Sequence, residues 1–278
     1  MVWQSNKALL VFLAVSSGIF YAILISFAEA LTQRILQAHY YKSRRQIKSK
    51  WRHILGGRSK CDHCEKKLNA VNLVPVFGYW LSGRKCDNCG NAIKARYWLS
   101  ELAAFVYGTI VFWLYPDITY ALTTGAYLVI LHVIMRIDWE YMLIPTEAIL
   151  TMLILGLLDL LNRFYGYTTT ATLSSDISLH LLISFSWFFL LHLIRILSRY
   201  RMGLADVRLT LALCFGLGYP LAVFLPTVAS ALGLVFYLLS RLKPAAGLVK
   251  NDRGLKTQVA FGVFLGLAFL LLRAFKIS

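Results

Sequence analysis

Long apolar stretches separated by short polar segments dominate the hydrophobic pattern of this chain. A helix needs about 20 predominantly apolar residues to cross the hydrocarbon core of a bilayer. Stretches of suitable length occupy residues 8–31, 98–115, 119–137, 144–161, 177–197 and 257–274. The pattern therefore predicts an all-α, polytopic membrane protein.

The apolar stretch from Val207 to Leu242 is too long for a single membrane helix. Its 36 residues would extend about 54 Å at 1.5 Å per residue, whereas the hydrocarbon core is about 30 Å thick. Gly216, Gly218 and Pro220 offer a break within it. We therefore expect two helices here, which brings the predicted total to about eight transmembrane helices.

Composition and charge support a membrane protein and orient it. Charged residues make up only 15% of the chain, whereas soluble domains carry about a quarter. The formal net charge is +16, and 15 of the basic residues lie between Thr32 and Tyr97, against three acids. Because cytoplasmic loops are enriched in Lys and Arg, we expect this loop in the cytoplasm and both termini outside. The Lys42–Arg52 run is expected to contact anionic membrane lipids, and no nucleic-acid-binding fold is visible.

Four of the five cysteines form two closely spaced pairs. Cys61-x-x-Cys64 and Cys86-x-x-Cys89 are separated by 21 residues. Each pair can chelate one ion from a tight turn, and two such turns complete a tetrahedral thiolate site. In the reducing cytoplasm a disulfide is disfavoured, so the spacing predicts structural Zn2+, with metal-free thiol pairs as the alternative. A four-cysteine site has no open position for a substrate, so we expect it to stabilise the loop.

Two carboxylates lie where predicted helices meet the cytoplasmic face. Asp138 ends the third predicted span and Asp206 begins the sixth. Ionisable groups at membrane depth usually face a bundle interior or a water-filled cavity. Two such carboxylates can share a proton, so that one activates water while the other protonates a carbonyl oxygen. Spacing alone leaves open the alternative that both aspartates cap helices or pair with Arg136 and Arg208.

A set of short motifs accompanies the cysteines and the two aspartates. They are Arg58-Ser59-x-Cys61-x-x-Cys64, Val74-Pro75-Val76, Gly83-x-Lys85-Cys86-x-x-Cys89, Arg96-Tyr97 with Ser100-Glu101, Asp138 followed by Ile144-Pro145, Gly203-x-x-Asp206-Val207-Arg208-Leu209, and Val259-Ala260-Phe261-Gly262-Val263-Phe264-Leu265. With them, the chain resembles the type IV prepilin peptidases, bifunctional leader peptidase/N-methyltransferases of the GxGD class of intramembrane aspartyl proteases. The resemblance covers residues 25–270 or so.

The resemblance implies specific roles and substrates. Asp138 and Asp206 would be the catalytic pair, and they would cleave the basic leader of type IV prepilins or pseudopilins that serve pili, secretion or DNA uptake. The cysteines would bind zinc, and S-adenosylmethionine would methylate the new N-terminus. Two departures, Ala205 at the second glycine of GxGD and a degenerate N-terminal element at residues 25–34, motivate an alternative: an inactive zinc-loop membrane scaffold that binds pilin precursors or assembly proteins.

A basic leader would be attracted to acids near the membrane boundary. We expect Glu29, Glu101, Glu140 and Glu147 to form an anionic lip for the leader, with Gly203 close to the substrate. Solvated acids at helix ends are the alternative for these glutamates. Gly262 and Gly266 are expected to pack helices closely. The predicted organisation is a first transmembrane helix at 1–31, the zinc-binding loop at 32–97, and a membrane peptidase domain of about seven helices at 98–278.

Overall fold

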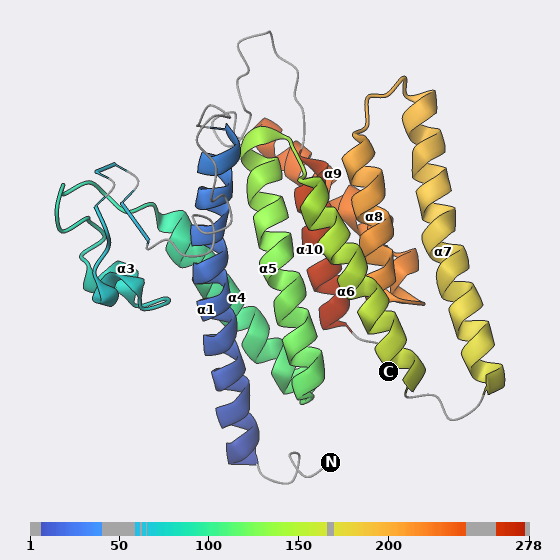
Figure 1. The fold of residues 1–278 in the computed structure, drawn as a ribbon, viewed down its shortest axis with the longest axis horizontal. Coiled ribbons are helices and arrows are strands. Elements are labelled where there is room, and N and C mark those ends of the chain that lie inside the picture. Colours follow the sequence, from blue (N-terminus) through green and yellow to red (C-terminus); the bar gives the residue numbers. More distant parts are fainter. Residues whose placement is uncertain are drawn as a thin grey trace. The chain divides into compact units, whose positions relative to one another are not determined.

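The computed structural model describes residues 7–40, 59–61, 63–64, 66–165, 170–242 and 260–275, and within these ranges the regular structure is helical apart from two isolated β-bridges (Figure 1). The all-α prediction is therefore confirmed. The Lys42–Arg52 run and Val259 lie outside the described residues. The helices are α1 (Lys7–Tyr40), η2 (Ala70–Leu73), α3 (Gly78–Leu81), α4 (Ala95–Leu114), α5 (Ile118–Tyr141), α6 (Thr146–Tyr165), α7 (Thr170–Leu197), α8 (Leu204–Leu217), η3 (Leu221–Val223), α9 (Leu225–Leu242) and α10 (Phe261–Ala274).

Four segments among the described residues are long and apolar enough to cross a membrane. They are Lys7–Leu36, Ala95–Leu114, Ile118–Tyr141 and Ile177–Leu197. Leu225–Ser240 and Phe261–Ala274 are shorter apolar helices. The polytopic character is thus supported, while the total of about eight spans stays a prediction.

The expected break in the long apolar stretch is present. Helix α8 ends at Leu217, and Gly218 follows with a φ of +76°, a backbone conformation that a residue with a side chain rarely adopts. Pro220 and the short η3 then lead into α9. The stretch is two helices because this turn cannot be continued as regular helix.

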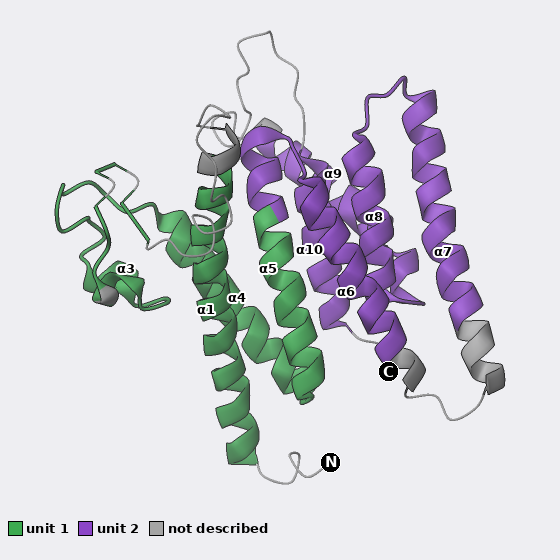
Figure 2. Ribbon diagram, viewed as in Figure 1, with its two compact units in different colours: residues 1–133 green, residues 134–278 purple. Residues whose placement is uncertain are grey.

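The chain divides into two compact units, Met1–Val133 and Ile134–Ser278 (Figure 2). The division lies within α5, and the organisation into residues 1–31, 32–97 and 98–278 stays a prediction. Helix α1 also continues past residue 31, to Tyr40. The first unit therefore contains the cysteine loop together with α1, α4 and most of α5.

In the first unit, small residues bring α1 and α4 into close contact. A Cβ on Gly18 would overlap Thr109, and one on Gly108 would lie 2.7 Å from the ring of Tyr21. Tyr21 is fully buried, and its hydroxyl donates a hydrogen bond to the carbonyl of Ala121 over 2.7 Å. This contact orients one face of α1 inward, and Glu29, two helical turns further along, lies on the same face.

In the second unit, a buried ion pair joins three helices. Arg273 of α10, only 3% exposed, lies 2.9 Å (Nη1 to Oδ2) from Asp159 of α6. The same guanidinium nitrogen donates to the carbonyl of Gly216 near the end of α8, also over 2.9 Å. Gly156 of α6 packs closely on α8, because a Cβ there would lie 2.8 Å from Cβ of Phe215. We call the three residues Asp159, Gly216 and Arg273 the clasp.

Candidate active site and metal centre

Asp138 lies in the last turn of α5. The helix ends at Tyr141, and Met142 has a φ of +54° before Pro145 leads into α6. The neighbouring Ile137 is almost fully buried, and Asp138 itself is only 5% exposed. This arrangement turns the Asp138 carboxylate towards the protein interior.

Asp206 lies in the first turn of α8. Gly203 is the N-cap residue of this helix, and its backbone N–H donates a hydrogen bond to the Asp206 carboxylate. This is half of a capping box, in which an acid three residues into the helix binds the N-cap amide. A Cβ on Gly203 would lie 2.9 Å from Oδ2 of Asp206. The close approach explains the glycine, and a contact between Gly203 and substrate stays a prediction.

The start of α10 contacts Asp138. The backbone amides of Gly262 and Val263 point towards its carboxylate, although Oδ2 makes no well-aligned hydrogen bond among the described residues. A Cβ on Gly262 would lie 2.7 Å from this Oδ2 and 2.9 Å from Cδ1 of Ile144. Gly262 therefore meets the aspartate, a contact that the sequence analysis missed when it assigned this glycine to helix packing.

The structure brings the two predicted aspartates together. The carboxylates of Asp138 and Asp206 lie within electrostatic range of each other. Neither forms an ion pair within the described part of the chain, and Arg136 instead contacts Glu140, with Nη2 2.8 Å from Oε1. Three helix ends, those of α5, α8 and α10, thus converge on two carboxylates that no described cation neutralises. This is the arrangement that proton sharing requires.

The four cysteines form one cluster. Their Sγ atoms all lie within 4.8 Å of one another, with 3.8 Å between Cys61 and Cys89 and 3.9 Å between Cys64 and Cys86. Tetrahedral zinc with Zn–S bonds of about 2.3 Å places its sulfurs about 3.8 Å apart. The described cluster therefore has the size and the ligand set of a four-thiolate metal site.

The two halves of this cluster have the same local structure. Each Cys-x-x-Cys turn is closed by an isolated β-bridge, Lys60 to Lys67 in one half and Lys85 to Ala92 in the other. Gly90 takes a φ of +69° at the end of the second turn, which glycine adopts without strain. The repeated geometry explains why four sulfurs from two separate segments meet.

Neighbouring groups shift the pKa values of the thiols in opposite directions. The backbone amide of Lys66 and the side chain of Asn88 lower the pKa of Cys64 to about 6. The backbone amide of Asn91 lowers the pKa of Cys89, but burial and the three other thiols outweigh it and raise this pKa to about 11. A bound metal ion would favour the thiolate form of all four cysteines, and the four could then coexist near neutral pH.

The four glutamates of the predicted lip fall into two groups. In the first unit, Oε2 of Glu101 accepts a hydrogen bond from the backbone N–H of Val76 over 2.8 Å, and Oε1 of Glu29 lies 3.3 Å from Nε2 of His132. In the second unit, Glu140 is exposed beside Arg136, and Glu147 is exposed in the first turn of α6. Only the exposed pair resembles a solvent-facing lip.

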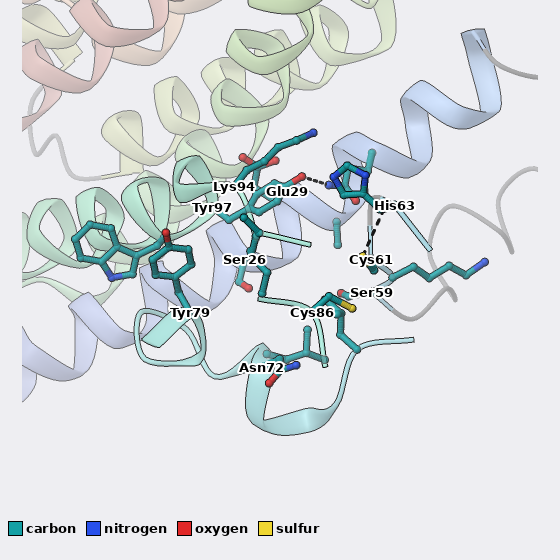
Figure 3. A pocket seen from close by; sticks show the side chains of 18 of the residues that line it. Ser26, Glu29, Ser59, Cys61, His63, Asn72, Tyr79, Cys86, Lys94 and Tyr97 are labelled. Atoms are coloured by element: carbon teal, nitrogen blue, oxygen red, sulfur yellow. Dashed lines mark hydrogen bonds between the residues drawn. The ribbon is translucent and has the colours of Figure 1, made fainter. Parts of the chain in front are cut away.

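Glu29 and Glu101 line a pocket of the first unit, formed by α1, the start of α4 and the cysteine loop (Figure 3). The pocket encloses about 890 Å³, its open mouth included. Its walls carry both acids, the lysines Lys60 and Lys94, and the aromatic rings of Tyr79, Tyr97 and Trp98. The sequence analysis missed the pocket, because its walls come from three separate segments and no single motif marks it.

Both sites lie in segments of the chain that match known protein families. The profile of the Bacterial Peptidase A24 N-terminal domain matches residues 19–115, which include the four cysteines. The profile of the Type IV leader peptidase family matches residues 125–238, which include both aspartates. No solved structure matches the chain.

Curated relatives carry one name, prepilin leader peptidase/N-methyltransferase. The protein of Dichelobacter nodosus is 31% identical over 188 residues, which are 66% of this chain and 63% of the relative. That of Stutzerimonas stutzeri is 29% identical over 220 residues, or 76% and 69% of the two chains. That of Aeromonas salmonicida is 30% identical over 183 residues, or 64% and 60%. The match thus spans less than two thirds of the first and third relatives. Together with the two profiles, these similarities show that the chain belongs to the type IV leader peptidase family.

Proposed function

We propose that the protein cleaves the basic leader of type IV prepilins or pseudopilins and then methylates the new N-terminus. The supporting observation is the convergence of Asp138 and Asp206 at three helix ends. Both aspartates lie inside the segment that matches the leader peptidase family. The relatives' shared name supports both reactions.

The contacts of the two aspartates suggest different roles for them. Amides at a helix N-terminus favour negative charge, and two of them, at the start of α10, face Asp138, whereas only the Gly203 amide is directed at Asp206 among the described residues. Close carboxylates do not both ionise readily. We therefore assign the carboxylate form to Asp138, which takes a proton from the attacking water, and the protonated form to Asp206.

The reaction then follows general acid–base chemistry. Water activated by Asp138 attacks the carbonyl carbon of the residue before the cut, while Asp206 donates its proton towards the carbonyl oxygen. Collapse of the tetrahedral intermediate breaks the C–N bond, and the proton on the former carbonyl oxygen returns to Asp206. The proton that Asp138 received from water passes to the leaving amine, which becomes the new N-terminus of the pilin.

Zinc and the methyl donor have separate roles in this proposal. Zn2+ would be held by Cys61, Cys64, Cys86 and Cys89, whose spacing fits it, and would stabilise the loop. S-adenosylmethionine, when bound, supplies the methyl group.

The proposed orientation follows the distribution of charge. The basic 32–97 loop and both aspartates lie on the cytoplasmic side of the cytoplasmic membrane, and both termini lie outside. The leader of the substrate lies on the same side. Glu140 and Glu147 are exposed and lie at the end of α5 and the start of α6, close in sequence to Asp138. We propose them, rather than the pocket residues Glu29 and Glu101, as the leader contacts.

Co-expression with a prepilin tests the proposal directly. Mass spectrometry of the pilin should show cleavage by the wild type and by Asp117→Asn, a control in which the exposed N-cap of α5 loses its charge but keeps a capping side chain. It should show intact precursor with Asp138→Asn and with Asp206→Asn. Intact precursor with the wild type, folded and loaded with zinc, would instead favour the inactive scaffold and point to Ala205.

A further inference from the structure

We propose that the pocket of the first unit binds S-adenosylmethionine, with Glu29 and Glu101 facing its cationic sulfonium and ammonium groups. The inference rests on the methylation half of the proposed function. It places methyl transfer in the first unit, apart from the aspartates of the second.

The two acids make the pocket selective for a cation. Glu29 is only 6% exposed, and the negative charges of Glu29 and Glu101 act on each other. Two carboxylates in one partly buried site repel, and a cation between them removes that repulsion. Among the described residues, Glu29 lies beside His132, and Glu101 accepts hydrogen bonds from Val76 and Ser26. The two carboxylates therefore give the pocket an anionic part, next to the cationic part that its lysines form.

The remaining walls distinguish a methyl donor from a basic leader. Lys60 and Lys94 also line the pocket, and they would repel a Lys/Arg-rich leader but attract a carboxylate. An amino-acid head carries an ammonium and a carboxylate together, so it needs walls of both signs. S-adenosylmethionine has this head beside its sulfonium, and a leader side chain does not.

The aromatic residues fit the base of the same ligand. The ring of Tyr79 stacks on that of Trp98, with centroids 6.0 Å apart and planes 21° apart. Gln33 donates a hydrogen bond to the hydroxyl of Tyr97 over 2.6 Å, which fixes this ring at the pocket wall. Flat, fixed rings of this kind bind flat heterocycles such as adenine by stacking. The base and the zwitterionic head thus each find a matching wall.

The cysteine loop is held against this pocket by defined contacts. Val76 has a φ of +67° and its backbone N–H binds Glu101. Gly78 packs so tightly that a Cβ there would lie 2.6 Å from the carbonyl oxygen of Asn72. Cys61 and Cys86 themselves line the pocket. The cysteine loop therefore forms part of the pocket wall, and a metal ion bound to it would stabilise that wall without taking part in methyl transfer.

The test is calorimetric titration of the zinc-loaded, full-length protein in detergent with S-adenosylmethionine and with S-adenosylhomocysteine, which lacks the sulfonium charge. Glu29→Gln and Glu101→Gln should each weaken S-adenosylmethionine binding by about 10-fold to 100-fold, because a charge-assisted contact is lost. Their effect on S-adenosylhomocysteine should be smaller. In Glu101→Gln the amide oxygen of the new side chain still accepts the Val76 hydrogen bond, so the loop is retained. Asp117→Asn should bind both ligands as the wild type does.

Three outcomes would overturn the inference. In the first, the wild type does not bind S-adenosylmethionine. In the second, Glu29→Gln and Glu101→Gln bind it as tightly as the wild type does. In the third, these variants keep their affinity for S-adenosylmethionine but lose affinity for a synthetic basic leader peptide. Unchanged zinc content and thermal unfolding show that each variant folds. Since binding is read without cleavage, a protein that binds the donor but leaves prepilin intact would contradict the peptidase proposal alone.

Discussion

The aspartate site and the pocket beside the cysteines differ in how the chain supplies their polar groups. At the aspartate site, three helix ends contribute two carboxylates and backbone amides, and no described side chain neutralises the pair. At the pocket, one loop and two helices contribute acids, lysines and aromatic rings. Proton transfer needs few groups in fixed positions, whereas recognition of a large zwitterion needs varied groups. The comparison teaches that each unit has the kind of site that one half of the proposed two-step reaction requires.

We expect the largest loss of cleavage from substitution of either of the two aspartates. Asp138→Asn or Asp206→Asn should lower prepilin cleavage by about a thousandfold or more, because either change removes one partner of the acid–base pair. Cleavage rates from mass spectrometry of the pilin provide the measurement. Near-normal cleavage by either variant would assign the chemistry to other residues.

Removal of the metal should affect the pocket before the aspartates. Zinc binds thiolates, so a strong chelator at neutral pH, or acidification, should remove the ion, because chelator and protons both compete for the partners of this bond. A chromogenic chelator can follow the zinc that is released. S-adenosylmethionine affinity should fall in parallel. Binding that persists after complete zinc loss would show that the loop holds its shape unaided.

A single methyl group at α10 should disturb the aspartate site specifically. Gly262→Ala would push on the Asp138 carboxylate, because the new Cβ would lie 2.7 Å from Oδ2. We expect kcat for cleavage to fall by about 10-fold to 100-fold with little change in KM, because a misplaced catalytic group slows the chemical step more than it weakens substrate binding. Gly233→Ala is the matched control, since its Cβ meets Phe264 at an ordinary 3.5 Å. Equal kcat in the two variants would refute a positioning role for Gly262.

The smallest expected effect concerns the exposed leader contacts. Charge reversal in Glu147→Lys or Glu140→Lys should raise the KM for prepilin several-fold while kcat stays near the wild-type value, because exposed charges act mainly on encounter and weak binding. High salt should reduce the difference. An unchanged KM at low salt in both variants would leave these acids as ordinary solvated side chains.

Local sequence signals predicted the elements better than their contacts. Gly218 and Pro220 marked the end of α8, and the cysteine spacing marked the cluster, because each signal acts within a few residues. The apolar run stopped at residue 31, yet α1 continues to Tyr40, since Thr32–Tyr40 contains neither Gly nor Pro to end a helix.

Contacts across long sequence separations escaped the sequence analysis. The approach of Gly262 to Asp138 joins residues more than a hundred positions apart, and nothing local to either residue indicates it. The hydrogen bond from Val76 to Glu101 likewise depends on how the loop folds back on α4. The two aspartates stood out because acids are rare in apolar segments, but only the family resemblance singled them out as a catalytic pair, and that role stays a prediction.

The clasp of Asp159, Gly216 and Arg273 has a mechanical consequence for substrate access. Along α8, Gly216 lies ten residues after Asp206, about 15 Å away, and along α10 Arg273 follows Gly262 by a similar distance. The two helices are thus pinned at the ends remote from the carboxylates. We therefore expect the aspartate ends of the two helices to separate more easily than the ends that the clasp joins. The proposed peptide substrate would then reach the carboxylates from those ends, while the clasp keeps the rest of the two helices together.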